Sequence, residues 1–161
     1  MHSPFAYKIV KDVLVGHRGY SYYGYEIIDK SKSSRGDKKS AKILLRLAAR
    51  LDVGSTFMPE DTPDVFLNAL KAADTRMSIL TDISLVDRYR LICSKGDHLT
   101  LDILMRALER PGRILAIKDV PSGWAKRLFE SLDEGLILEG KRNILIFSRP
   151  GMQKVSYTVS I

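Results

Sequence analysis

The chain has very little cysteine. Cys93 is the only one among 161 residues, so no disulfide can form within the chain. Such a composition is typical of a reducing compartment. No apolar run approaches the ~20 residues that a membrane-spanning helix needs, and the first residues lack the basic and apolar regions of a secretory signal peptide. We therefore expect a cytoplasmic protein that does not associate with a membrane.

Several motifs that would identify a class of enzyme are also absent. The sequence has no group of Cys and His residues at the spacing of a metal site, no phosphate-binding loop and no serine nucleophile motif. These absences argue against a zinc site, a P-loop nucleotide hydrolase and a serine hydrolase. The order of the predicted helices and strands, and the residues at the ends of the strands, are therefore the remaining indications of function.

The composition is that of an ordinary globular protein, with 45% hydrophobic and 28% charged residues. A chain of this length buries roughly 70% of its unfolded surface, which is enough for a core without a metal or a disulfide. The net charge is +7, and residues 1–54 carry 11 Lys and Arg residues against 5 Asp and Glu residues. We predict one domain over 1–161, with a basic helical extension at 1–54 and an α/β core at 55–161.

The basic residues of this extension gather around one predicted helix. Residues 40–51 have the spacing of an amphipathic helix, and residues 30–40 before it are polar and rich in serine, which predicts a mobile loop. A cationic segment can attract nucleic acid or another acidic partner; an ordinary solvent-exposed helix face is the alternative. The residues that would contact such a partner are Lys38, Lys39, Lys42, Arg46 and Arg50.

Two predicted strands carry polar residues at their carboxyl ends. Residues 89–93 and 113–118 are short apolar runs, and residues 100–109 between them have helical spacing. A strand–helix–strand unit predicts two parallel strands, and open α/β sheets bind ligands at the carboxyl ends of such strands. Lys95 and Lys118 should then lie side by side. The polar residues at these ends are Lys95, Gly96, Asp97, His98, Lys118 and Asp119.

The remaining elements complete an α/β pattern. Residues 56–58 and 77–80 predict short strands, 136–138 and 143–147 predict an antiparallel pair because the link between them is short, and 156–161 predicts an edge strand. The expected fold is therefore a doubly wound, mostly parallel α/β sheet that ends in an antiparallel pair of strands.

This order resembles the Rossmann-like fold of the class I S-adenosylmethionine-dependent methyltransferase superfamily. More specifically, it resembles a group of bacterial O-methyltransferase-like proteins through four features. These features are His2-Ser3-Pro4-Phe5, Tyr22-Tyr23-Gly24-Tyr25-Glu26, the basic helix at 40–51 and the turn Gly96-Asp97-His98. The resemblance implies S-adenosylmethionine as the cofactor and transfer of a methyl group as the reaction. The positions that it assigns to cofactor binding are Met58, Glu60, Lys95, Gly96 and Asp97.

The chain departs from this family at the residues that would hold the cofactor. Met58 stands where the family has an acidic residue, and Glu60 and Asp64 stand where it has glycines. Glycines let the backbone approach the cofactor, whose carboxylate lies near the start of the next helix. Lys95 and Lys118 replace carboxylates that bind a divalent metal in cation-dependent relatives, so we expect no metal.

We also expect the sheet to be shortened at one edge. The sequence offers few candidate catalytic residues. Only about ten residues separate the strand at 77–80 from that at 89–93, where the family has a further helix and strand that help to form the adenine pocket. His98 beside Asp97 is a candidate general base, with a structural histidine as the alternative, and Asp119 is a second catalytic candidate. Cys93 is expected to be a core thiol.

These observations favour a methyltransferase-like protein with an eroded S-adenosylmethionine site that is non-catalytic or weakly active. Two alternatives stay open. One is an active S-adenosylmethionine-dependent methyltransferase with an altered site, and the other is a module that binds nucleic acid or another polyanion. An oligomer is a further alternative, and the sequence does not show whether another chain supplies the missing part of the sheet.

Overall fold

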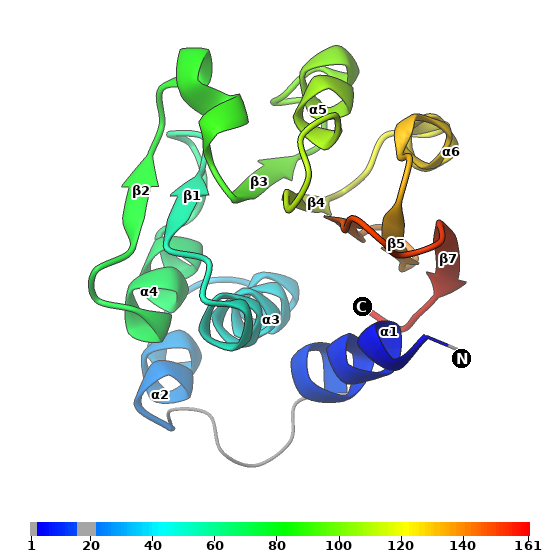
Figure 1. Ribbon diagram of the computed structural model, residues 1–161. Coiled ribbons are helices and arrows are strands. Elements are labelled where there is room, and N and C mark those ends of the chain that lie inside the picture. The colour runs from blue at the N-terminus through cyan, green and yellow to red at the C-terminus, as the bar shows by residue number, and fades with distance from the viewer. Residues whose placement is uncertain (1–2, 16–21) are drawn as a thin grey trace. The chain divides into compact units, whose positions relative to one another are not determined.

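The computed structural model describes residues 3–15 and 22–161, and it shows an α/β protein with a mixed, mostly parallel sheet of seven strands (Figure 1). The chain divides into two compact units. The first contains Met1–Gly54 and Asp61–Ser78, and the second contains Ser55–Glu60 and Ile79–Ile161. His2, which belongs to one of the predicted motifs, lies outside the described residues.

The first unit is helical. Ser3 caps its first helix, because the Ser3 hydroxyl accepts a hydrogen bond from the Ala6 N–H at 3.2 Å, and Pro4 takes the first helical position, where it is well tolerated. A single turn of π-helix, η1, continues this helix directly. The helices of this unit are α1 (Pro4–Ile9), η1 (Val10–Val15), α2 (Tyr22–Lys30), α3 (Arg35–Leu51) and α4 (Asp64–Ala73).

The prediction of a mobile loop over 30–40 was wrong. Helix α3 begins at Arg35, because the Ser34 hydroxyl accepts a hydrogen bond from the Asp37 N–H at 3.1 Å and so caps the helix. Asp37 in the first turn also favours a helix start. The predicted helix at 40–51 is therefore the C-terminal part of a 17-residue helix, and only residues 31–34 connect α2 to α3.

Helix α3 packs closely against α2 and α4. Its buried face includes Leu44, Leu45, Leu47 and Ala48. A Cβ atom at Gly24 of α2 would overlap the Leu45 side chain and would lie 3.3 Å from the Ala72 Cβ. Glycine at position 24 therefore allows α2 to approach both neighbouring helices.

The second unit is built on the sheet, whose strand order is β2-β1-β3-β4-β6-β5-β7. The pairs β1–β3, β3–β4 and β5–β7 are parallel, whereas β6 runs antiparallel to both β4 and β5. The predicted antiparallel pair and the predicted edge strand are confirmed. The strands are β1 (Ser55–Phe57), β2 (Ser78–Leu80), β3 (Leu91–Lys95), β4 (Ile114–Lys118), β5 (Gly135–Glu139), β6 (Ile144–Ser148) and β7 (Val155–Thr158).

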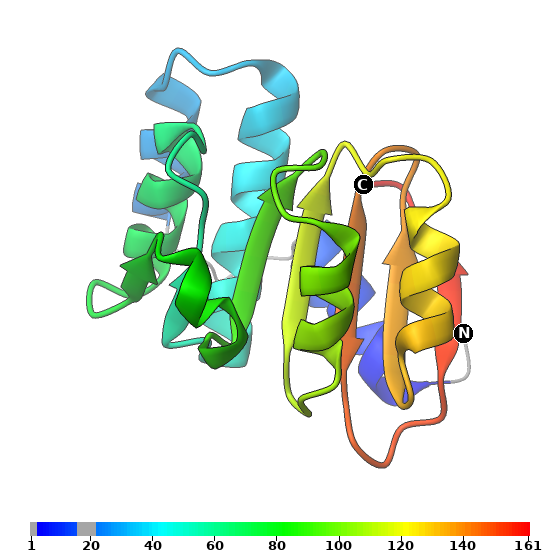
Figure 2. The same cartoon turned by 90° about the horizontal axis from the view of Figure 1, so that it is seen from above.

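Two helices cover one face of this sheet side by side, α5 (Leu101–Leu108) and α6 (Trp124–Ser131) (Figure 2). Thr100 caps α5 by accepting the Ile103 N–H at 3.3 Å. The core under these helices contains Ile92, Leu115 and Ile146, all fully buried. Burial of each such side chain stabilises the folded state by about 1.5–3 kcal/mol. A short 3-10 helix, η2 (Ile83–Arg88), joins β2 to β3 and contributes Val86 to the same core.

Candidate functional site

The strand order reverses beside β1. The chain passes from β1 through α4 to β2, which lies next to β1, and then enters β3 on the other side of β1. In open α/β sheets such a reversal leaves a crevice outside the carboxyl ends of the two flanking strands, and ligands bind there. The residues that follow β1 and β3 are Met58, Pro59, Glu60, Gly96, Asp97 and His98, which include most of the predicted site residues.

The end of β1 presents an apolar residue and a carboxylate. Met58 is 3% exposed, so its side chain belongs to the core. Its backbone N–H donates to the Leu80 carbonyl oxygen at 3.1 Å, which continues the pairing of β1 with β2. Glu60, two residues later, is exposed. No carboxylate therefore stands at position 58 to accept hydrogen bonds from a cofactor, and a negative charge stands just beyond it.

The ends of β3 and β4 place two lysines next to each other. Lys95 is the register partner of Lys118 on the neighbouring parallel strand, as predicted. The Gly96 N–H donates to the Lys118 carbonyl oxygen at 2.8 Å, and Gly96 adopts a φ of 56°, a left-handed conformation that glycine adopts at little cost. Lys95 is exposed and Lys118 is half-buried. Register partners share one face of a sheet, so the two lysines lie side by side on the same face.

The two catalytic candidates lie at the ends of neighbouring strands. His98 is exposed in the turn after β3, and its backbone N–H donates to the Lys95 carbonyl oxygen at 3.2 Å. Asp119 directly follows β4 and forms an ion pair with Arg142, with 3.0 Å between Oδ1 and Nη2. The Val120 N–H also donates to the Arg142 carbonyl oxygen at 2.9 Å. Asp119 is thus held by the turn between β5 and β6.

Cys93 is confirmed as a core thiol. It is buried in β3, and this burial raises its pKa to about 12. The thiol therefore stays protonated at neutral pH, whereas a nucleophilic cysteine requires the thiolate. Cys93 takes no part in the chemistry of this edge.

The S-adenosylmethionine of the resembled family fits these residues poorly. Glu60 stands where the resemblance puts the carboxylate of the cofactor, and Lys95 and Lys118 stand where it puts acidic residues. Like charges ~4 Å apart repel by about 1 kcal/mol even in water. The thioether of Met58 is only a weak hydrogen-bond acceptor. We therefore derive no reaction step through this cofactor.

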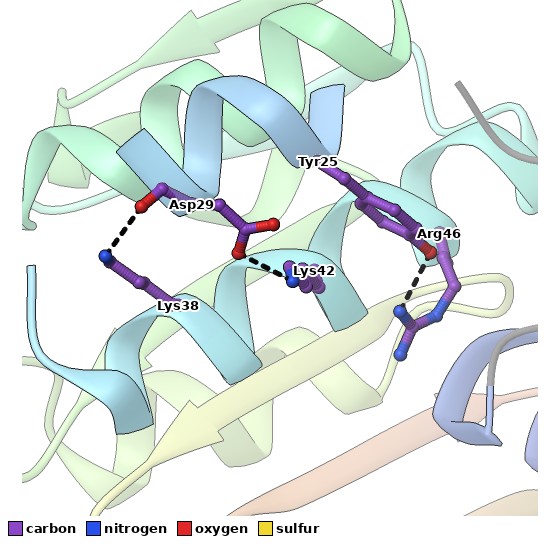
Figure 3. Close-up of polar contacts among 5 residues, drawn as sticks. All are labelled: Tyr25, Asp29, Lys38, Lys42 and Arg46. Carbon is purple, nitrogen blue, oxygen red and sulfur yellow. Dashed lines mark hydrogen bonds and ion pairs between the residues drawn. The ribbon is translucent and has the colours of Figure 1, made fainter. Parts of the chain in front are cut away.

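The basic residues of α3 do not form one surface. Arg46 is 7% exposed and donates to the carbonyl oxygens of Val13 and Leu14, at 2.5 and 3.1 Å. It also donates to the Tyr25 hydroxyl at 3.0 Å (Figure 3). The expectation that Arg46 contacts a partner was wrong, because the first unit uses its guanidinium internally. Arg50 is exposed and pairs with Asp12 at 2.9 Å.

The other basic residues of α3 lie near its start. Lys42 pairs with the Asp29 carboxylate at 2.7 Å, Lys38 donates to the Asp29 carbonyl oxygen at 2.8 Å, and Lys39 is exposed. Arg35 lies on the same helix face but was missed, because it falls within the predicted loop at 30–40. The pattern Ser34-x-x-Asp37, a capping motif, was the signal that could have found it.

Comparison of the chain with protein-family models, with curated proteins and with solved structures finds no match. Across residues 3–15 and 22–161, no helix combines the length and the apolar character needed to cross a bilayer. The same residues contain no group of three or more His, Cys, Asp or Glu side chains placed to hold a metal ion. The resemblance to methyltransferases therefore remains a proposal.

Proposed function

We propose that this chain is a methyltransferase-like protein whose S-adenosylmethionine site has eroded, so that it is non-catalytic or weakly active. One observation carries the proposal: the paired lysines Lys95 and Lys118 and the buried Met58 occupy the strand ends where the resemblance expects acidic residues. The ends of β1, β3 and β4 keep the positions of a nucleotide site while their chemistry is unsuited to this cofactor.

The topology of the sheet supports the first half of this proposal. The reversal of strand order beside β1 is the arrangement at which doubly wound sheets bind nucleotides. Strand β3, helix α5 and strand β4 form a parallel crossover unit, and the sheet ends with the antiparallel pair β5 and β6. These are the features that the resemblance implies for the core of the fold.

The connection between β2 and β3 supports the second half. It consists of η2 (Ile83–Arg88) and short flanking turns, where the resembled fold has a helix and another strand. Strand β2 is consequently the last strand on its side of the sheet. The part of the fold that would contribute to an adenine pocket is shortened in this chain.

Titration calorimetry with S-adenosylmethionine and with S-adenosylhomocysteine tests the proposal. We expect no saturable heat for either ligand with the full chain, and no shift of the thermal unfolding midpoint. Saturable binding of either ligand would count against an eroded site, and transfer of a labelled methyl group to an acceptor would identify an active enzyme.

A further inference from the structure

An open hollow lies over the start of α3. Its volume is about 610 Å³. All of its lining residues belong to the first unit, from the last turns of α2 and the first turns of α3. They are Asp29, Arg35, Gly36, Lys38, Lys39 and Lys42.

Four of these residues are cations on one face of α3. Arg35, Lys38, Lys39 and Lys42 are spaced i, i+3, i+4 and i+7, so they form a continuous stripe. Arg35 and Lys39 are a like-charge pair four residues apart, and so are Lys38 and Lys42. Such pairs destabilise a helix, so an anion bound between them would lower the free energy of the folded chain.

The protein itself compensates only part of this charge. Asp29 is the single carboxylate of the lining, and it pairs with Lys42 at 2.7 Å. Lys38 donates to the uncharged backbone carbonyl of Asp29 at 2.8 Å and keeps its charge (Figure 3). The side chains of Arg35 and Lys39 make no hydrogen bond or ion pair with another residue that the structure describes. The hollow therefore has an excess of positive charge.

Gly36 lines the hollow and, because it has no side chain, leaves the backbone of α3 accessible there. A Cβ atom added there would meet only the Ser34 hydroxyl oxygen, at 3.9 Å, so packing does not require glycine. Glycine inside a helix also costs stability relative to alanine. A residue without a side chain at this point allows a ligand to approach the backbone of the first turn of α3.

We propose that this hollow binds a phosphate-bearing anion. The Arg35 guanidinium is suited to two parallel hydrogen bonds with phosphate oxygens, and the three lysines supply point charges around it. The positive end of the α3 macrodipole acts in the same direction. A free polyphosphate and the backbone of a nucleic acid both present this group. The proposal is independent of the methyltransferase resemblance.

The test compares two double variants of the full chain, each of which loses one lysine and one arginine. Arg35→Gln with Lys39→Gln removes the two uncompensated cations of the hollow. Lys126→Gln with Arg127→Gln removes two exposed cations of α6 and serves as the matched control. Both should keep the wild-type circular dichroism spectrum, because none of these four side chains is buried.

The probes are inorganic phosphate, tripolyphosphate and a single-stranded oligothymidylate, each followed by calorimetry. We expect saturable tripolyphosphate binding by the wild type and the control, and binding at least about tenfold weaker in the R35Q/K39Q variant, for the loss of two charge-assisted contacts. If the oligothymidylate binds as well and competes with tripolyphosphate, the source is a nucleic-acid backbone. If it does not, the source is a small phosphorylated compound.

Two results would overturn the proposal. One is the absence of saturable binding for all three probes. The other is an equal loss of binding in the two double variants, which would indicate attraction to the net charge of the chain rather than to this hollow. Salt gives a second readout for oligothymidylate: the slope of log K against log salt should become shallower by about 1.4 in R35Q/K39Q, or roughly 0.7 per lost phosphate contact.

Discussion

Arg46 donates its Nε–H to the backbone carbonyl of Val13, 33 residues earlier in the chain, over 2.5 Å. The same guanidinium also reaches the Leu14 carbonyl and the Tyr25 hydroxyl. A buried guanidinium with three acceptors is a structural element of the fold, because a buried charge is costly unless hydrogen-bond partners compensate it. Arg46 thus fixes the end of η1 and helix α2 to helix α3.

Replacement of this arginine should therefore be costly. We expect Arg46→Leu to lower the free energy of unfolding by about 2–4 kcal/mol, because it leaves carbonyl oxygens without donors. The control is Arg50→Leu, which removes a largely exposed ion pair with Asp12 and should cost about 1 kcal/mol or less. Equilibrium unfolding in urea measures both, and equal effects of the two substitutions would contradict the role assigned to Arg46.

Two helical glycines should respond to alanine in opposite directions. Gly24→Ala should destabilise the chain by about 1–3 kcal/mol, because the new methyl group overlaps the buried Leu45 side chain. Gly36→Ala should stabilise it by about 0.5–1 kcal/mol, because the site is open and alanine favours the helix. Thermal unfolding of the two variants checks the sign of each effect, and the same sign for both would be inconsistent with the packing described.

The buried thiol should make stability fall at alkaline pH. Burial raises the pKa of Cys93 from 9.0 to about 12, so the unfolded chain loses this proton at a lower pH than the folded chain. The contribution of the protonated thiol to the free energy of unfolding is present in full below about pH 9 and is lost as the pH rises toward 12. At about pH 10.5 the loss amounts to about 2 kcal/mol.

A comparison with Cys93→Ala isolates this effect from the titration of tyrosines and lysines. The wild type should lose more stability than the variant between about pH 8 and pH 10.5, measured by urea unfolding at each pH. Parallel losses in the two proteins would show that the thiol is not shielded from solvent. Alkylation of the wild type at neutral pH should also be slow in the absence of urea.

We expect acidic residues introduced at the ends of β3 and β4 to create affinity for a hard cation. The double variant Lys95→Asp with Lys118→Asp places two carboxylates in register on β3 and β4, close in sequence to Asp97 and Asp119. Oxygen ligands of this kind suit Ca²⁺. We expect calorimetry to detect Ca²⁺ binding in this variant but not in the wild type.

The control for this variant is Lys126→Asp with Arg127→Asp, which makes the same change of charge on α6. Ca²⁺ binding by the control at similar affinity would mean that net charge, and not the register of β3 and β4, attracts the ion. Failure of the strand-end variant to bind Ca²⁺ while it retains its fold would argue against the proposed resemblance to cation-dependent methyltransferases at this edge.

Local patterns in the sequence were sufficient for most elements and for one part of the site. The apolar runs at 89–93 and 113–118 predicted β3 and β4, and their polar ends predicted that Lys95 and Lys118 would be neighbours. This succeeded because parallel strands joined by one helix are usually adjacent in the sheet.

Contacts between distant segments could not be predicted in this way. Helical periodicity grouped Arg46 with Lys42 and Arg50 as residues that would contact an acidic partner. The Arg46 side chain is instead buried, and Val13 and Tyr25 on other helices supply its acceptors. The start of α3 was also missed, because serine and basic residues predicted a loop while the Ser34 cap determined the helix. Tertiary partners determine the burial of Arg46, whereas the start of α3 depends on a local capping motif that a reading by composition overlooks.

The path of the chain between its two units has a consequence for how the protein can be divided. The backbone leaves the first unit at Gly54, returns to it at Asp61 and leaves it again after Ser78. Neither unit is therefore a continuous stretch of sequence. A fragment that starts at residue 55 would carry α4 without α2 and α3, its partners in packing. A single proteolytic cut between residues 54 and 61 should consequently leave a nicked protein, and not two separable fragments.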